Sequence, residues 1–224
     1  MLPVFLKVSK MSICYIISAG DCNGIDIDKK DGDLIIAADK GLEYCRKFGV
    51  AEDIVIGDFD SLGFVPEAAN VITLPVAKDD TDTSYAVKYA MEKGFDKFVI
   101  YGATGGKRAD HTFANIALLA YIAKKGGIGF IAADGYTITA VTDLAIRFPS
   151  YMIGDISVFS FDEKSEGVTE KGLRYSLEDA VLENSVAVGV SNSFTGQESL
   201  VSVKHGTLLI YFSGKFSDCT IDKL

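Results

Sequence analysis

The sequence predicts an α/β N-terminal domain with a Rossmann-like, mostly parallel layered sheet, followed by an all-β C-terminal domain folded as an antiparallel sandwich. Up to about residue 132, short β-branched runs alternate with helical stretches, which is the rhythm of a parallel layered sheet. Beyond Gly135 the apolar segments are short and alternating, with no long helix between them, as in an antiparallel β domain. We therefore expect two domains, at residues 11–134 and 136–224, in a chain of 224 residues that is 48% hydrophobic.

The strands expected in the N-terminal domain are short apolar runs rich in β-branched residues. They lie at residues 13–18, 34–38, 54–57, 71–74, 97–101 and 128–132. Helices are expected between them, at residues 41–48, 81–93 and 112–125. Residues 1–10 are expected to form an upstream extension, with Met11 as a plausible start, and residues 21–33 a solvated acidic loop.

Six strands are expected in the C-terminal domain. They lie at residues 136–141, 144–148, 155–161, 185–190, 200–203 and 207–212. Residues 162–167 are charged and rich in turn formers, so we expect them to connect two strands. No internal repeat of fixed period is visible.

Carboxylates follow the strand expected at residues 54–57. Asp58 and Asp60 stand two residues apart, so on an extended segment both side chains point to one side of the chain. Ligands of open α/β sheets bind at the carboxyl ends of the strands, and hard oxygen ligands suit Mg²⁺. The alternative interpretation is an ordinary solvated turn capped by an aspartate.

A second acidic cluster, at residues 78–82, favours the metal interpretation. Thr81 can cap the helix that follows, which puts Asp82 in the first turn, where the helix dipole also favours phosphate. Asp58, Asp60 and Asp82 are therefore the expected metal ligands.

A glycine-rich loop follows the strand expected at residues 97–101. It reads Gly-Ala-Thr-Gly-Gly-Lys-Arg from position 102 and precedes a helix, which is the layout of a phosphate cradle. The backbone of Gly105 and Gly106 can approach an anion closely, and Arg108 can hold phosphate oxygens in a fork. A Walker A motif is absent, and a plain tight turn is the alternative interpretation.

The composition excludes several classes of partner. A net charge of −9 argues against non-specific binding to nucleic acid or anionic membranes, because a phosphate-neutralising basic stripe is missing. The four cysteines form no C-x-x-C pair, so a zinc site is not expected. We expect reduced thiols, as in a cytoplasmic protein. No apolar run reaches the roughly 18 residues that a membrane helix needs.

Taken together, these motifs resemble the thiamine pyrophosphokinase family. The resemblance is carried by Ala-Ala-Asp-Lys-Gly from position 37, Ile-Gly-Asp-Phe-Asp-Ser from 56, Lys-Asp-Asp-Thr-Asp from 78, Gly-Ala-Thr-Gly-Gly from 102 and Asp-His-Thr-Phe-Ala-Asn from 110. Gly-Leu-Arg-Tyr-Ser-Leu from 172 and Val-Ser-Asn-Ser-Phe from 190 resemble the family's thiamine-side segments, so nearly the whole chain is covered. The chain departs from the family pattern at Lys40, where glycine is usual, and at Ala109, where leucine or phenylalanine is commoner.

The resemblance implies an ATP-dependent pyrophosphotransferase. The thiamine hydroxyl would attack the β-phosphorus of ATP with Mg²⁺ bridging the phosphates, giving thiamine diphosphate and AMP, and such a transition state needs positioning and charge neutralisation. It also implies a homodimer, with thiamine bound between one subunit's α/β domain and the other's β domain.

The implied site residues fall into three groups. Asp58, Asp60, Asp82 and Asp110 would be catalytic, and Asp110 could either complete the cation shell or accept the hydroxyl proton. ATP and its phosphates would be held by Asp39, Lys78, Thr104, Gly105, Gly106 and Arg108. Thiamine would be held by Tyr175, Ser191 and Asn192, through a ring face for the thiazolium and hydrogen bonds to the aminopyrimidine.

Some alternatives stay open. Asp110 could instead be a helix N-terminal charge, and His111, which is more often structural at a helix start, is left out of the catalytic set. The rival enzymes are a Mg²⁺-dependent nucleotide phosphohydrolase and a pyrophosphokinase for another small alcohol. The rival from another class is a thiamine- or nucleotide-binding protein without turnover.

Overall fold

The computed structural model describes residues 12–59, 66, 70–75 and 79–223. The chain forms two compact units, of which the first ends at Ala103 and the second begins at Thr104. Two expected site residues, Asp60 and Lys78, lie outside the described residues, and so does the expected extension at 1–10. None of the helices in the described ranges is long and apolar enough to span a lipid bilayer.

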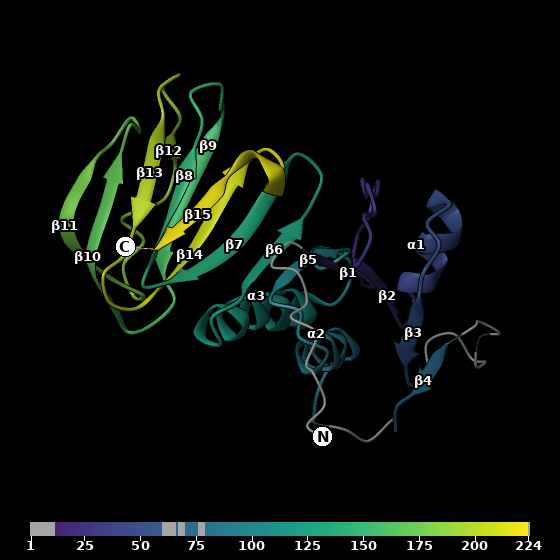
Figure 1. Ribbon diagram of the computed structural model, residues 1–224. Helices are drawn as coiled ribbons and strands as arrows, with labels where there is room; N and C mark the ends of the chain where they lie inside the picture. Colours follow the sequence, from purple (N-terminus) through teal and green to yellow (C-terminus); the bar gives the residue numbers. More distant parts are fainter. Residues whose placement is uncertain (1–11, 60–65, 67–69, 76–78, 224) are drawn as a thin grey trace, which may run out of the picture. The chain divides into compact units, whose positions relative to one another are not determined.

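The first unit is built on parallel strands (Figure 1). Its strands are β1 (Cys14–Ile17), β2 (Leu34–Ala38), β3 (Ile54–Gly57), β4 (Val71–Thr73) and β5 (Lys97–Tyr101). They lie side by side in the order β5-β1-β2-β3-β4, and every pair is parallel. Strand β1 is buried along its whole length, as expected for a central strand covered on both faces.

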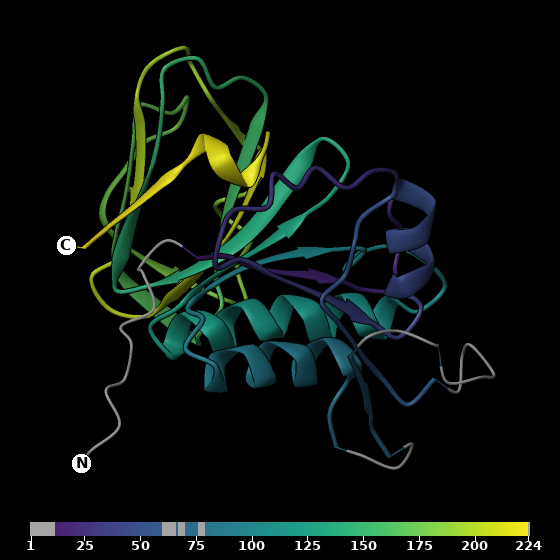
Figure 2. The ribbon, with the colours of Figure 1, turned by 45° about the vertical axis from the view of Figure 1, so that its right-hand side comes forward.

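Two helices cover this sheet, α1 (Gly41–Phe48) and α2 (Asp82–Glu92). The crossover through α1 carries the chain from β2 to β3, and the one through α2 carries it the other way, from β4 to β5. Since such crossovers are right-handed, reversing the direction moves the helix to the opposite face. Figure 2 shows α1 and α2 on the two sides of the strands.

The second unit contains the helix α3 and antiparallel strands (Figure 1). These elements are α3 (Ala109–Lys124), β6 (Ile128–Ala132), β7 (Tyr136–Thr142), β8 (Leu144–Phe148), β9 (Asp155–Ser160), β10 (Lys164–Lys171), β11 (Leu177–Glu183), β12 (Asn192–Ser193), β13 (Ser199–Ser202), β14 (Thr207–Ser213) and β15 (Thr220–Lys223). One layer has the order β12-β9-β14-β7-β6 and carries α3 against β6, β7 and β14. The other layer has the order β11-β10-β13-β8-β15.

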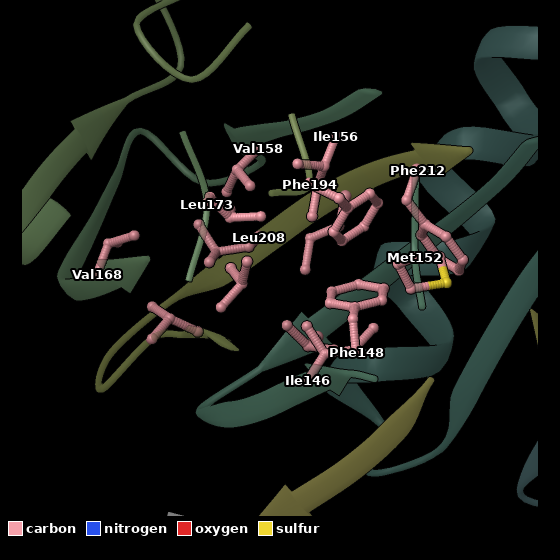
Figure 3. Packing of buried hydrophobic residues seen from close by; sticks show 14 of the residues in the cluster. Ile146, Phe148, Met152, Ile156, Val158, Val168, Leu173, Phe194, Leu208 and Phe212 are labelled. Carbon is pink, nitrogen blue, oxygen red and sulfur yellow. The ribbon is translucent and has the colours of Figure 1, made fainter. Parts of the chain in front are cut away.

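The core of the second unit lies between these two layers (Figure 3). Phe148 is at its centre, 1% exposed, with its ring centroid 5.2 Å from that of Phe194 and 5.0 Å from that of Phe212. The chain passes from one layer to the other at Asp143, whose φ of 53° is left-handed. The Asp143 carboxylate accepts a hydrogen bond from the Gly206 amide, which holds this corner in place.

The parallel strands with covering helices and the separate all-β sheet confirm the coarse fold prediction. Several details were wrong. Residues 185–190 form turns and no strand, because they carry valines that face solvent. Residues 162–167 were expected to be a connection, yet β10 begins at Lys164, and β11, β12 and β15 were missed. The helix α3 begins at Ala109, three residues before the expected start.

The missed strands β11 and β15 are the two edge strands of their layer, where polar side chains can face solvent. In β11 the residues Glu178, Asp179 and Glu183 are exposed, and only Leu182 is fully buried. Charged side chains on an edge strand discourage pairing with other chains. The predicted domain division at residues 134–136 stays a prediction.

Candidate functional site

Two aspartates lie at the carboxyl ends of neighbouring strands in the first unit. Asp39 follows β2 directly and Asp58 follows β3 directly. The Asp39 amide donates a hydrogen bond to the Ile56 carbonyl at 2.8 Å, so the two strand ends are tied together. A Cβ at Gly57 would lie only 3.2 Å from the Asp39 Cα, and glycine therefore permits this close approach.

The backbone around this pair is strained. Asp39 and Phe59 have φ values of 48° and 57°, in the left-handed region that side chains with a Cβ avoid. Each such residue costs on the order of 1–2 kcal/mol, and strain of this kind gathers at functional sites. Asp39 follows β2 directly and Phe59 follows Asp58 directly, so both strained residues lie at the carboxyl ends of neighbouring strands.

The start of α2 is brought to the end of β1 by a buried hydrogen bond. The hydroxyls of Ser18 and Thr83 lie 2.8 Å apart, and both residues are buried. Thr83 follows Asp82, the first residue of α2. The expected capping by Thr81 is confirmed, since its hydroxyl accepts from the Ser84 amide at 3.1 Å. Asp82 thus sits at a capped helix start, where the dipole favours negative charge in a ligand.

The donor set at this edge fits a hard cation, although it does not form a closed cage. Within residues 12–59, 66, 70–75 and 79–223, no three histidine, cysteine, aspartate or glutamate side chains gather as a metal cluster. The Oδ1 atom of Asp39 is buried and has no hydrogen-bond partner among the residues described. Mg²⁺ commonly takes one or two protein carboxylates and completes its shell with phosphate oxygens and water. Carboxylates at strand ends, one of them with an unused oxygen, suit that pattern.

The glycine-rich loop needs glycine for its backbone shape. Gly105 and Gly106 have consecutive φ values of 74° and 72°, a conformation that turns successive amides toward one side. Both are exposed, while the neighbouring Thr104 is buried and its hydroxyl lies 3.3 Å from the Tyr136 hydroxyl. Thr104 is therefore already fixed by a neighbour in the second unit.

Arg108 and Asp110 form a two-pronged ion pair at the start of α3. The Arg108 Nε lies 2.9 Å from Asp110 Oδ1, and its Nη2 lies 2.6 Å from Oδ2. Both side chains are exposed. The hydrogen bond from Arg108 lowers the pKa of Asp110 to about 2, so this carboxylate is ionised and weakly basic while the pair holds.

The three expected thiamine-side residues lie together in the second unit. The Asn192 Oδ1 accepts from the Tyr175 amide at 2.9 Å, and its Nδ2 donates to the Tyr175 carbonyl at 2.6 Å. Ser191 has a left-handed φ of 61°, and its amide donates to the Ser157 hydroxyl. The Tyr175 ring is 61% exposed, with the Arg174 guanidinium 5.6 Å from its centroid.

Sequence reasoning missed three residues of these surroundings. Ser18 and Thr83 are 65 positions apart, and neither stands in a motif that signals their hydrogen bond. Glu170 is a buried carboxylate that accepts a hydrogen bond from Asn192 Nδ2 at 2.9 Å. Its polar neighbours in the sequence predict an exposed residue instead. A serine directly after an apolar strand was the one available signal, for Ser18.

Enzymes that act on phosphates commonly have carboxylates at the carboxyl edge of a parallel sheet, a capped helix start and a glycine-rich loop. The chain has all three features, and one of its carboxylates, Asp39, has a strained backbone. Comparison with known proteins makes the class specific. Residues 29–131 match the family model of the thiamin pyrophosphokinase catalytic domain, and residues 144–208 match that of the thiamin pyrophosphokinase vitamin B1 binding domain. The chain belongs to the thiamin pyrophosphokinase family.

Individual relatives agree with this assignment. The chain is 29% identical to the thiamine pyrophosphokinase of Bacillus subtilis over 193 residues, which cover 79% of this chain and 86% of that protein. It is 27% identical to a thiamin pyrophosphokinase of Caenorhabditis elegans over 172 residues, covering 70% of this chain and 68% of that protein. The crystal structure of the Bacillus subtilis thiamine pyrophosphokinase superposes with a TM-score of 0.79 at 26% identity, covering 91% of this chain and 99% of that one.

Proposed function

We propose how this chain carries out the thiamine pyrophosphokinase reaction, which transfers pyrophosphate from ATP to the hydroxyl of thiamine and gives thiamine diphosphate and AMP. The thiamine hydroxyl oxygen forms a bond to the β-phosphorus of ATP, and the bond from that phosphorus to the bridging oxygen of AMP breaks. The hydroxyl proton passes to solvent water as the new bond forms, and AMP departs with the bridging oxygen. The single observation that carries the proposal is the acidic carboxyl edge of the first unit, made by Asp39, Asp58 and the start of α2.

Mg²⁺ is the proposed metal of this edge. Asp58, Asp60 and Asp82 would hold it, and when bound it would neutralise negative charge on the ATP phosphates. Asp39, with its buried and unused Oδ1, is proposed to orient the nucleotide beside them. The left-handed backbone of Asp39, and that of Phe59 next to Asp58, supports a site at this edge, because strained residues gather at functional sites.

The phosphates are proposed to bind at the exposed amides of Gly105 and Gly106, with Thr104, Lys78 and Arg108 as further donors. The ion pair between Arg108 and Asp110 favours one of the two roles open to Asp110. A carboxylate with a pKa near 2 is a poor base for an alcohol, so we propose that Asp110 orients Arg108 toward the phosphates and contributes charge at the metal.

Thiamine is proposed to bind at Tyr175 and Ser191 in the second unit. The exposed Tyr175 ring already lies beside a guanidinium, and the same electron-rich face suits the cationic thiazolium of thiamine. Asn192 has both amide hydrogens bonded within the chain. We therefore propose that Asn192 contributes to the thiamine site indirectly, by holding the backbone of Tyr175.

The assembly and location are proposed on the same family grounds. A homodimer is supported by exposed apolar side chains in the second unit, since groups of this kind mark protein interfaces. They are Tyr175, Val181, Val186, Val188 and Val190. A cytoplasmic location is supported by the buried thiols of Cys14, Cys22 and Cys45. A Rossmann-like ATP domain at 11–134 and a thiamine domain at 136–224 are the proposed division of labour.

The reaction is tested by incubating the purified protein with ATP, Mg²⁺ and thiamine and measuring the products by chromatography. We expect thiamine diphosphate and AMP in equal amounts, and loss of both with Asp58→Ala. Formation of ADP or free phosphate would favour a phosphohydrolase. Thiamine binding by Asp58→Ala with no turnover by the unaltered protein would favour a binding protein.

A further inference from the structure

Asn192 has its whole hydrogen-bonding capacity engaged inside the second unit. Its Oδ1 accepts from the amides of Tyr175 and Ser193, both at 2.9 Å, and its Nδ2 donates to the Tyr175 carbonyl at 2.6 Å and to Glu170 Oε2 at 2.9 Å. One side chain therefore forms hydrogen bonds with both the N–H and the C=O of Tyr175. Whatever fixes the Asn192 amide also fixes the backbone that carries the Tyr175 ring.

Glu170 supplies the remaining contact of that amide from the other layer of the sandwich. It lies on β10, between Leu177 of β11 and Val201 of β13, whereas Asn192 lies on β12 of the opposite layer. Glu170 is 1% exposed, and Val168, two residues earlier on the same strand, is buried in the core. A carboxylate thus occupies a position where the core pattern favours an apolar side chain.

This carboxylate is costly to bury. Desolvation raises the pKa of Glu170 above its ordinary value, and the bond from Asn192 offsets this only in part. Its second oxygen, Oε1, has no hydrogen-bond partner among the residues described. Replacing both partners of a buried polar pair by apolar groups of the same shape is often neutral or stabilising, so stability alone does not favour a carboxylate with one unpaired oxygen at this position.

We propose that Glu170 is a positioning residue for thiamine recognition: through Asn192 it holds the backbone of Tyr175, so that the exposed ring is presented in a fixed orientation to the thiazolium. The inference rests on the thiamine-binding role of Tyr175 proposed above. Glu170 reaches the ring only through Asn192. Fixing an aromatic platform before the ligand arrives lowers the entropy lost on binding, so the effect should fall on thiamine affinity and spare ATP.

Three variants of the full chain separate positioning from support of the fold. Glu170→Leu introduces an apolar side chain of similar size, which cannot accept the Asn192 hydrogen bond. Glu170→Gln keeps an oxygen that accepts it. Ser165→Ala is the matched control, because Ser165 is a buried polar residue of the same strand whose hydroxyl bonds to Ser160 and the Thr207 carbonyl, away from Tyr175.

The measurements are steady-state KM for thiamine, KM for ATP and kcat, with cooperative thermal unfolding as the check that each variant is folded. We expect Glu170→Leu to raise the thiamine KM about tenfold with the ATP KM changed less than about twofold. Glu170→Gln should bring the thiamine KM back to within about threefold of the unaltered protein. Ser165→Ala should leave both KM values as they were.

A folded Glu170→Leu protein with an unchanged thiamine KM would overturn the inference, and so would a Glu170→Gln protein no better than Glu170→Leu. Hydrogen exchange of the segment around Tyr175 gives a readout that needs no substrate. Its protection should fall in Glu170→Leu and return in Glu170→Gln. If exchange behaves in this way but the unaltered protein does not turn over thiamine, the proposed function fails and the positioning contact survives.

Discussion

Gly41 offers the sharpest test of how the first unit presents its acidic edge. It opens α1, two residues after Asp39, and it packs against the last residue of β1. A Cβ built at Gly41 would lie 1.8 Å from the Ile17 carbonyl oxygen and 2.6 Å from its carbon, whereas ordinary contacts begin near 3.4 Å. Gly41→Ala therefore forces the start of α1 away from β1 by more than about 1 Å, because backbone on both sides leaves no flexible side chain to yield.

Two effects of known size follow. Overpacking against backbone belongs at the upper end of the usual range, about 3 kcal/mol or more of lost stability. For a chain of this length each kcal/mol lowers Tm by about 2–4 °C, so Tm should fall by about 6–12 °C. A displacement of about 1 Å at a catalytic edge can cost about 100-fold, and we expect a loss of that order in kcat/KM through the movement of Asp39.

The assays are thermal unfolding and steady-state formation of AMP, with Gly24→Ala as the matched control. Gly24 lies in the same unit and has nothing within 4 Å of its built Cβ, so this change should alter stability by less than about 1 kcal/mol. A Gly41→Ala protein with the Tm and the activity of Gly24→Ala would refute the reasoning. The close approach of β1 and α1 would then not position the site.

Three further predictions concern other parts of the molecule. Phe148→Ala should lower the free energy of unfolding by about 3–5 kcal/mol in urea titrations, because its ring is 1% exposed between Phe194 and Phe212, and a loss below about 1 kcal/mol would contradict the packing described. Thr81→Ala should cost about 1 kcal/mol by the same titration through loss of the α2 cap, whereas Thr81→Ser should cost little. Burial raises the pKa of Glu170 above 4.5, so the native state keeps a proton that the unfolded state has lost, and the stability of the unaltered protein should fall as pH rises through and above that value. The Tm of Glu170→Gln minus that of the unaltered protein should therefore increase as pH rises above about 4.5. A difference that stays constant across that range would count against the buried charge.

Much of the fold could be predicted because its strands are apolar. Runs such as Ile54-Val55-Ile56 signal a buried strand without any knowledge of their neighbours, and the strands of the first unit other than the partly exposed β4 are of this kind. Among the strands that were missed, β10, β11 and β15 place charged residues on an exposed face, where the pattern resembles a loop. The valines between residues 186 and 190 led to the opposite error, a predicted strand that does not form, because these apolar side chains are exposed.

The candidate site divides in a similar way. The positions of Asp39 and Asp58 at strand ends and of Asp82 at a helix start could be predicted, because each stands in a short motif, whereas their roles in binding stay predictions. The hydrogen bond between Ser18 and Thr83 could not, since contacts across 65 residues leave no trace in local patterns. The same holds for Glu170, whose burial follows from the meeting of two sheets and not from its neighbours in the sequence.

The strand order of the first unit has a consequence for how the protein is made. Strand β1 pairs with β2 on one side, but its other partner, β5, puts Phe98 opposite Cys14, 84 positions later. At a synthesis rate of about 5–20 residues per second, about 4–17 s pass between the emergence of the two strands. During that interval the apolar β1 offers an unpaired edge to any strand nearby. We therefore expect the β1 edge of the ribosome-bound chain to stay open to mispairing until β5 has emerged.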